Sequence, residues 1–178
     1  MPSPSQTLLL DAPPLLHAAK VDRLDVFGSL LSRFDRLTTQ AVVDEIRERD
    51  AEAHAVVTKA DWLRVVPTGG LDFLVAYSTW GRRMGLKDDH DIGETTLCAY
   101  AEIHGGTVVL DDCNARKVAE LNGLTVRGTV GLIADACRCG EYPVAGASSL
   151  VDDLHDSGMR LPFARGGFEG WCREKRLL

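Results

Sequence analysis

Short apolar runs alternate with longer helical patterns along this chain, and this alternation limits the possible folds more than any other feature. The clearest runs lie at residues 7–10 and 107–110 and consist of leucine, valine and threonine. Neither run alternates with polar residues, which is typical of strands that are buried on both faces of a parallel sheet. The sequence therefore predicts an α/β fold, in which helices cover both faces of the sheet as a three-layer sandwich.

The remaining elements follow from apolar spacing and from helix-capping residues. The chain of 178 residues fits a single domain spanning residues 1–178. Within it, residues 160–178 show no clear pattern and are predicted to be an irregular extension. The predicted strands are 7–10, 34–38, 63–66, 107–110 and 125–126, and the predicted helices are 13–20, 25–33, 39–50, 71–84, 94–104, 115–122, 130–139 and 148–157.

Charge and cysteine content exclude several classes of function. The formal net charge is −6, so the chain cannot bind nucleic acid as a bulk polycation and would need local basic patches or metal ions. Five cysteines match no disulfide or zinc pattern and are expected to be reduced thiols. Because there is no signal core and no membrane-length apolar run, we expect a cytoplasmic protein that does not enter membranes.

Acidic residues follow the two clearest strands. Asp11 comes directly after the first of them, and Asp111 and Asp112 come directly after the second. Ligands of open parallel sheets bind beyond the carboxyl ends of the strands. We therefore expect these acids to lie near one another at a ligand-binding edge.

Two further acids lie on predicted helices. Glu45 flanks the apolar face of its helix, whereas Asp44 points more nearly toward solvent. Glu94 lies in the first turn of its helix, three residues after Asp91. That spacing resembles a capping box, which gives Glu94 a structural alternative.

Each acid has such an alternative when it is considered singly. Asp11 and the Asp111–Asp112 pair could be helix caps, and Glu45 could be a solvated surface charge. Considered together, clustered carboxylates repel one another unless a cation neutralises them. Oxygen-only ligands select Mg²⁺ or Mn²⁺, and these ions can activate water to attack a phosphodiester.

The order of these segments resembles PIN-domain proteins from about residue 8 to about residue 154. The resemblance is carried by Leu-Leu-Leu-Asp11, by the Thr-Thr segment that leads to Glu45, and by Asp91-Ile-Gly-Glu94. It continues through Val-Val-Leu-Asp-Asp112 and the later Gly-Thr-Val-Gly segment. The Asp-Asp and Gly-Thr features are similar to one subgroup of the VapC-like ribonuclease toxins.

The resemblance implies a five-stranded parallel sheet of order 3-2-1-4-5 and a metal-dependent ribonuclease. It implies Mg²⁺ or Mn²⁺ as cofactor, and RNA, a small antitoxin and a second copy of the chain as partners. The implied catalytic residues are Asp11, Glu45, Glu94 and Asp112. The implied metal ligands are Asp11, Glu94 and Asp112, with Asp111 as the alternative fourth acid.

Two departures from the family pattern leave a second function open. Ala12-Pro13 follows the first acid where many relatives have a small polar residue, and the third acid is glutamate rather than aspartate. A PIN module that binds RNA or protein without cleaving it is the alternative, and a generic binding domain whose acids are caps is the third hypothesis.

The stretch from residue 71 to 84 carries a stripe of Phe73, Tyr77, Trp80 and Met84, which predicts core packing or, alternatively, an interface with a second copy or an antitoxin.

Basic residues near the predicted edge and in the tail are candidates for RNA contacts. In the tail, aromatic residues beside arginines suit single-stranded nucleic acid, although a solvated terminus with an aromatic residue packed onto the domain is the preferred explanation. The candidate substrate-binding residues are Arg116, Lys117, Arg82, Arg83 and Lys87, and those of the tail are Arg165, Arg173, Lys175, Arg176, Phe168 and Trp171.

Overall fold

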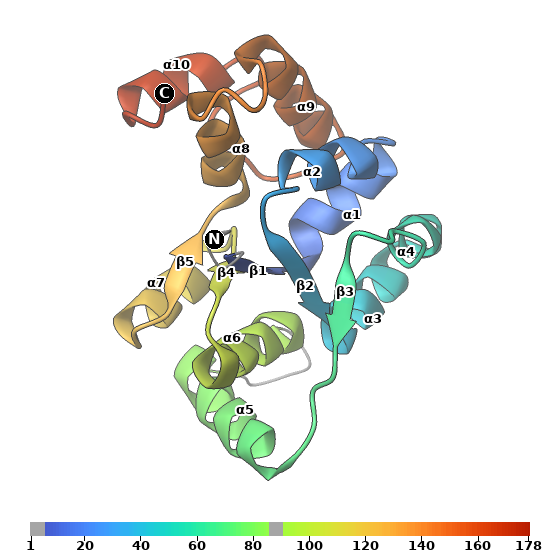
Figure 1. The fold of residues 1–178 in the computed structure, drawn as a ribbon, viewed down its shortest axis with the longest axis vertical. Helices are drawn as coiled ribbons and strands as arrows, with labels where there is room; N and C mark the ends of the chain where they lie inside the picture. The colour runs from blue at the N-terminus through green and yellow to red at the C-terminus, as the bar shows by residue number, and fades with distance from the viewer. Residues whose placement is uncertain (1–5, 86–90) are drawn as a thin grey trace, which may run out of the picture.

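The computed structural model describes residues 6–85 and 91–178, and its centre is a five-stranded sheet (Figure 1). The strand order is β3-β2-β1-β4-β5, and every neighbouring pair is parallel. The predicted fold class and strand order are confirmed. The strands are β1 (Thr7–Leu10), β2 (Asp35–Thr39), β3 (Arg64–Val66), β4 (Thr107–Val109) and β5 (Thr125–Arg127).

The central strand β1 brings its carboxyl end next to that of β4. Leu8, Leu9 and Leu10 are at most 1% exposed, as expected for a strand covered on both faces. Leu10 pairs in register with Val109, so the residues that follow each strand leave the sheet side by side. This register places the acids after β1 and β4 at one edge.

The helices form groups around the sheet. Helix α6 packs against β1, β2 and β4, and α5 packs on α6. These two helices lie at one end of the molecule, and α8, α9 and α10 lie at the other (Figure 1). The helices are α1 (Ala12–Lys20), α2 (Leu24–Leu30), α3 (Gln40–Arg49), α4 (Ala51–Val57), α5 (Leu71–Met84), α6 (Ile92–His104), α7 (Cys113–Leu121), α8 (Thr129–Arg138), α9 (Val144–Asp156) and α10 (Phe168–Glu174).

Helix α4 is absent from the sequence-based prediction. Asp50 ends α3 in an extended conformation, and its side chain accepts a hydrogen bond from the Ala53 amide at 2.8 Å. The same residue therefore closes one helix and caps the next. An apolar pattern cannot show such a break, because Ala53 and Val57 continue the helical spacing of buried residues.

The prediction of an irregular tail is wrong for its last part. Helix α10 buries Phe168 and Cys172, which are spaced four residues apart and face the core. Trp171 packs against the Phe163 ring with a centroid separation of 5.3 Å. Phe168 is fully buried and therefore cannot stack on a nucleic-acid base. The nucleic-acid alternative is wrong for Phe168, and the preferred interpretation, an aromatic residue packed onto the domain, is confirmed.

The stripe on α5 belongs to the core, as its spacing predicts. Phe73 and Trp80 are buried, and Tyr77 and Met84 pack against the core cluster. All five cysteines are free thiols. Within residues 6–85 and 91–178, no helix is both long enough and apolar enough to traverse a bilayer.

Candidate metal centre at the sheet edge

Asp11 lies at the end of β1 and is buried without a complete set of hydrogen-bond partners. Its side chain is 3% exposed, and its Oδ1 atom has no hydrogen-bond partner among the described groups. Asp11 occupies the N-cap position of α1, but its side chain makes no capping hydrogen bond. The helix-cap alternative for Asp11 is therefore wrong, and a buried carboxylate oxygen is left for another ligand.

Glu45 reaches the same edge from α3. This helix begins where β2 ends, with Thr39 at its N-cap position, as predicted from Thr38 or Thr39. Glu45 Oε1 accepts a hydrogen bond from Arg49 Nη1 at 3.1 Å. Asp44 instead pairs with Arg47 at 3.1 Å, although its side chain is about as exposed as that of Glu45 (39% and 36%).

Gly93, in the first turn of α6, allows Asp11 and Glu45 to approach this helix closely. A Cβ atom built on Gly93 would lie 3.0 Å from Glu45 Oε2 and 3.4 Å from Asp11 Oδ1. Both carboxylates therefore point at the backbone of the residue just before Glu94. The structure brings Asp11, Glu45 and the start of α6 together, although they come from three distant parts of the chain.

The predicted capping box at the start of α6 is not formed. Asp91 has a left-handed conformation with φ of 68°, and its side chain makes no capping hydrogen bond. Its backbone carbonyl accepts a hydrogen bond from Thr95 Oγ1 at 2.8 Å instead. Among the described residues, the Glu94 side chain forms no hydrogen bond, so the structural alternative that was strongest for Glu94 is wrong.

Burial and neighbouring acids disfavour the ionisation of Asp11 and Glu94. Burial raises the pKa of Asp11 well above its ordinary value of 3.8, and the charges of Glu94 and Glu45 raise it further. Burial also raises the pKa of Glu94 to about 8, with additional contributions from Asp91, Asp112 and Glu45. A divalent cation at this point would remove the repulsion that these shifts reflect.

Asp111 joins the end of β4 to the start of α8. Its Oδ1 accepts from the Thr129 amide at 2.9 Å, and its Oδ2 accepts from Thr129 Oγ1 at 2.6 Å. Burial raises the pKa of Asp111, and the two Thr129 hydrogen bonds oppose that rise. Both carboxylate oxygens of Asp111 accept hydrogen bonds from Thr129. Asp111 therefore has the structural role that was its alternative to metal binding.

Asp112 caps α7 with one oxygen only. Its Oδ1 accepts from the amides of Asn114 and Ala115, each at 2.8 Å. The side chain is exposed, and its charge contributes to the raised pKa of Glu94. Capping therefore does not exclude a second role, and Asp112 remains ahead of Asp111 as the fourth acid.

The donor set suits a hard divalent cation. All candidate ligands are carboxylate oxygens, and the buried Asp11 Oδ1 lacks a partner. However, no three His, Cys, Asp or Glu side chains of the described residues are already arranged to hold one ion. The acids form a converging cluster at one edge and not a closed cage of ligands.

The predicted substrate-binding residues differ in how they are engaged. Arg116 donates from Nη2 to the Leu110 carbonyl at 2.9 Å and from Nε to the same oxygen at 3.3 Å. Arg83 is bound to Glu102 at 2.9 Å and lies over the Trp80 ring. The side chains of Lys117 and Arg82 are exposed, and Lys87 lies outside the described residues.

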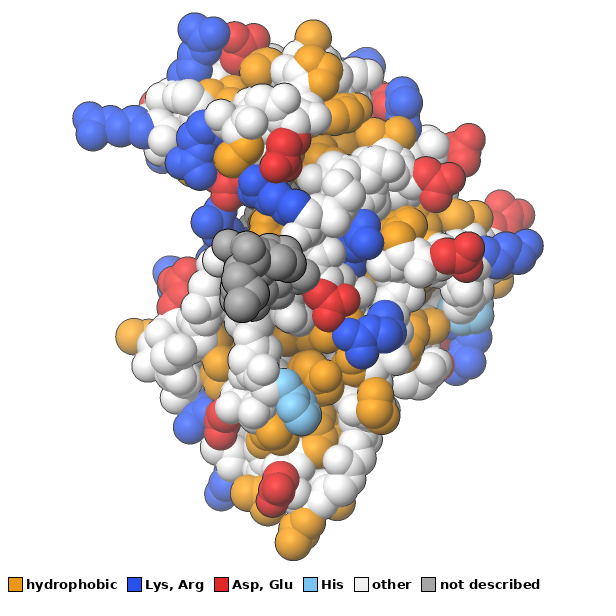
Figure 2. Space-filling model, viewed as in Figure 1, with side chains coloured by type: hydrophobic (Ala, Val, Ile, Leu, Met, Phe, Trp, Pro, Cys, Tyr) orange, Lys and Arg blue, Asp and Glu red, His pale blue; other side chains and the backbone are white. Residues whose placement is uncertain are grey.

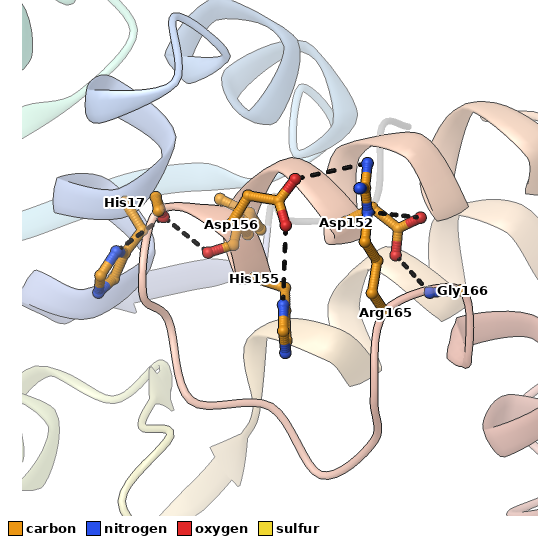
Figure 3. Close-up of polar contacts among 8 residues, drawn as sticks. His17, Asp152, His155, Asp156, Arg165 and Gly166 are labelled. Carbon is orange, nitrogen blue, oxygen red and sulfur yellow. Dashed lines mark hydrogen bonds and ion pairs between the residues drawn. The ribbon is translucent and has the colours of Figure 1, made fainter.

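The tail cations are mostly paired within the chain. Figure 2 shows Lys and Arg side chains over the end of the molecule where α8, α9 and α10 lie. Arg165 lies 3.4 Å from Asp156 and 3.9 Å from Asp152 (Figure 3). Arg173 is 2.6 Å from Glu169, and Lys175 is 3.9 Å from Glu174. Arg165 thus joins the segment before α10 to α9, and Arg173 and Lys175 pair with neighbours on α10 or directly after it. These contacts give the predicted RNA contacts of the tail no direct support.

His17 is buried, and its contacts give it a structural role. His17 Nδ1 lies 2.9 Å from Ser157 Oγ (Figure 3). The Ser157 hydroxyl donates its single proton to the Leu154 carbonyl at 2.6 Å. His17 must therefore donate to the serine and cannot act as its base, so this pair joins α1 to α9 and is no nucleophilic site.

The sequence-based prediction missed Gly93 and Arg49. Arg49 could have been found, because it lies four residues after Glu45 on one helix face. The role of Gly93 depends on how α3, α6 and β1 pack against one another, and no local pattern signals it. Thr129 was also missed, since its acceptor Asp111 lies 18 residues earlier in the chain.

Comparison with known proteins agrees with this architecture. The family model described as DUF3368, a PIN domain, matches residues 7–165. No curated protein and no solved structure matches the chain. The matched residues include all five strands and every acid of the candidate centre. The chain belongs to the PIN-domain family, whose members are generally nucleases that use divalent metal ions.

Proposed function

We propose that this protein is a divalent-metal-dependent endoribonuclease that hydrolyses RNA phosphodiester bonds. The observation that carries the proposal is the buried Asp11 Oδ1, which lacks a hydrogen-bond partner and lies beside Glu45 and the start of α6. A buried carboxylate in this state is costly unless a cation binds it. Membership of a family of nucleases supports hydrolysis as the chemistry of that site.

The acids would have different roles, which depend on their surroundings. Asp11, Glu94 and Asp112 would hold Mg²⁺ or Mn²⁺, which supplies an activated water and neutralises developing charge on the phosphate. Arg49 holds Glu45 through Oε1, which leaves Oε2 directed at the site to orient a water molecule. The exposed Lys117 would contact a phosphate, since it lies on α7, the helix that Asp112 caps.

A non-cleaving module is the second candidate. Its support is that no three acids of the described residues already surround one ion position, and that Asp112 uses one oxygen as a helix cap. In this alternative the edge would bind RNA without activating water. The two candidates predict the same fold and differ in whether a bound metal leads to cleavage.

The deciding experiment uses the purified full chain, a structured RNA and Mn²⁺. We expect cleavage that EDTA abolishes and that added Mn²⁺ restores, and calorimetry should detect Mn²⁺ binding without RNA. RNA binding with no cleavage would support the non-cleaving module. Absence of both cleavage and Mn²⁺ binding would exclude the proposed ribonuclease.

The subgroup resemblance extends this proposal to biology. We propose that the ribonuclease acts as the toxin of a toxin–antitoxin pair and that a small antitoxin protein restrains it in the cytoplasm. Induced expression should then arrest growth of the host cell, and co-expression of an antitoxin found by searching the neighbouring genes for a short open reading frame should relieve the arrest. Growth that is unaffected by expression of the active nuclease would contradict the toxin role.

Gly93→Ala tests the geometry of the site without removing a charge. The added methyl group would lie about 3 Å from Glu45 Oε2, so that this carboxylate must move. We expect Mn²⁺ affinity to fall about tenfold. Alanine favours the helix by about 1 kcal/mol over glycine, whereas the new methyl group would also lie 3.2 Å from Cγ2 of the buried Val42. The two effects oppose each other, so stability should change by less than about 1 kcal/mol.

A matched control for this variant is Gly131→Ala, in the helix α8. No atom lies within 4 Å of a Cβ built there, so the control tests helix propensity alone. Calorimetric titration with Mn²⁺ measures both variants. Unchanged affinity in Gly93→Ala would mean that the close approach of the carboxylates is irrelevant to metal binding.

A further inference from the structure

Three buried threonines lie directly behind the candidate metal centre. Thr38 and Thr39 are the last residues of β2, and Thr96 lies in the second turn of α6, which packs against α3 and β2 (Figure 1). Thr38 and Thr39 are fully buried, and Thr96 is 6% exposed. A buried hydroxyl is costly unless it is hydrogen-bonded, so the partners of these three show which groups they hold in place.

The hydroxyl groups of Thr39 and Thr96 form a hydrogen-bonded chain with one direction. Thr96 Oγ1 donates its single proton to the Gly93 carbonyl at 2.7 Å. The Thr39 hydroxyl lies 2.7 Å from Thr96 Oγ1, so Thr39 must be the donor of that bond. Thr39 Oγ1 in turn accepts from the Val42 amide at 3.5 Å. The chain therefore joins the first turn of α3 to the first turn of α6, and every proton in it is used.

Thr38 holds the end of β1 in the same way. Its hydroxyl donates to the Leu10 carbonyl at 2.8 Å, which fixes the peptide group that precedes Asp11. The two adjacent residues at the end of β2 therefore bind β1 through one hydroxyl and α6 through the other. These elements lead into the first and third acids, and α3, which follows β2 directly, carries Glu45.

We propose that Thr39 and Thr96 are positioning residues, which hold α6 against α3 so that the acids of the centre stay close together despite the repulsion between their charges. The bond to the Gly93 carbonyl is decisive, because Glu45 Oε2 and Asp11 Oδ1 approach the backbone of α6 at this glycine. The role rests on the proposed metal-dependent function, and neither hydroxyl would contact the ion or the RNA.

Thr96→Val keeps the shape of the side chain and removes both of its hydrogen bonds. We expect the affinity for Mn²⁺, measured by calorimetry without RNA, to fall about tenfold, as is usual when a group that orients metal ligands is lost. Thr96→Ser keeps the hydroxyl and should bind Mn²⁺ as the wild type does. Thr39→Val should lower the affinity similarly, and the two changes combined should cost little more than one, because they remove a shared bond.

Thr95→Val is the matched control. Thr95 is also fully buried on α6, and its hydroxyl donates to the Asp91 carbonyl at 2.8 Å, at the start of the same helix. The control therefore loses a hydrogen bond of the same kind without releasing α6 from α3. Its affinity for Mn²⁺ should equal that of the wild type.

A second measurement needs neither metal nor cleavage. In EDTA, Asp11→Asn relieves the repulsion between the acids only to the extent that the fold keeps them together. The rise in melting temperature caused by Asp11→Asn should therefore be about half as large in the Thr96→Val background as in the wild-type background. In the Thr95→Val background, this rise should be as large as in the wild type.

The two measurements separate this role from the function on which it rests. A wild type that binds no Mn²⁺, or that binds it without cleaving RNA, contradicts the ribonuclease, while the melting temperatures still decide the role of Thr96. Unchanged Mn²⁺ affinity in Thr96→Val, an equal loss in Thr95→Val, or an equal rise from Asp11→Asn in both backgrounds would overturn the proposal. Circular dichroism shows whether each variant is folded, and Thr39→Val replaces Thr96→Val if that variant is not.

Discussion

Replacing Asp11 with asparagine is expected to lower Mn²⁺-dependent RNA cleavage at least about a hundredfold while raising the stability of the metal-free protein. The loss follows because the buried Oδ1 of Asp11 is the best candidate for a direct metal ligand, and a metal contributes several kcal/mol to phosphoryl transfer. The gain follows because the change removes a buried charge that Glu94 and Glu45 oppose. The same substitution should therefore lower the cleavage rate and raise the stability of the metal-free protein.

The measurements are initial cleavage rates and thermal melting in EDTA. We expect the melting temperature of Asp11→Asn to lie about 3 °C or more above that of the wild type. For a domain of this size, the melting temperature shifts by about 2–4 °C for each kcal/mol of stability. Asp44→Asn is the control, because Asp44 lies beside Glu45 in sequence yet pairs with Arg47. Asp44→Asn should change neither the initial cleavage rate nor the melting temperature appreciably. Full activity in Asp11→Asn would remove the basis of the proposed metal centre.

The second large effect is a loss of stability as pH rises in the absence of metal. The pKa of Glu94 is about 8 in the folded chain and 4.5 in an unfolded one, so the folded state favours the protonated acid. A group of this kind stabilises the fold fully below about pH 4.5, and that contribution is lost as pH rises to about 8. Asp11, whose pKa is also raised, acts in the same direction.

Urea unfolding in EDTA at pH 5, 6.5 and 8 measures this dependence. We expect the free energy of unfolding to fall on the order of a few kcal/mol over this interval, at about 1.4 kcal/mol per pKa unit. Glu94→Gln should flatten the profile and make the protein more stable than wild type at pH 8. Glu120→Gln, at an exposed position on α7, should reproduce the wild-type profile.

Bound Mn²⁺ should oppose the loss of stability that occurs as pH rises in the metal-free protein. Mn²⁺ binds the ionised acids, so its stabilisation should be larger at pH 8 than at pH 5. Equal stabilisation at both values would indicate that the ion binds somewhere other than at Glu94. A profile that rises with pH in EDTA would show that the acids are already compensated within the chain.

Much of the fold could be predicted because its strands carry strong local signals. Unalternating apolar runs at residues 7–10 and 107–110 predict buried parallel strands, and their acids follow directly. The strand order came from the family resemblance, since local patterns do not contain it. Helix α5 was predicted with both of its ends correct. At its C-terminal end, Gly85 has the left-handed backbone conformation that commonly ends a helix at glycine.

The details of the candidate site depended on tertiary contacts and could not be predicted as well. The residues 91–94 have the spacing of a capping box, but the left-handed backbone of Asp91 prevents it. Which of Asp111 and Asp112 keeps a carboxylate oxygen free for a ligand depends on Thr129, which comes from the next strand–helix unit and binds both oxygens of Asp111. The tail helix was missed because Phe168 and Cys172 give too short an apolar pattern to stand out.

The pairing of β1 with β4 has a consequence for the timing of synthesis. Leu9 pairs with Val108, so Asp11 cannot join the acids after β4 until the whole segment between the two strands has been synthesised. The contact between Asp111 and Thr129 requires a still longer nascent chain. A nascent chain that ends before β4 therefore carries Asp11 and Glu45 but cannot assemble the candidate centre.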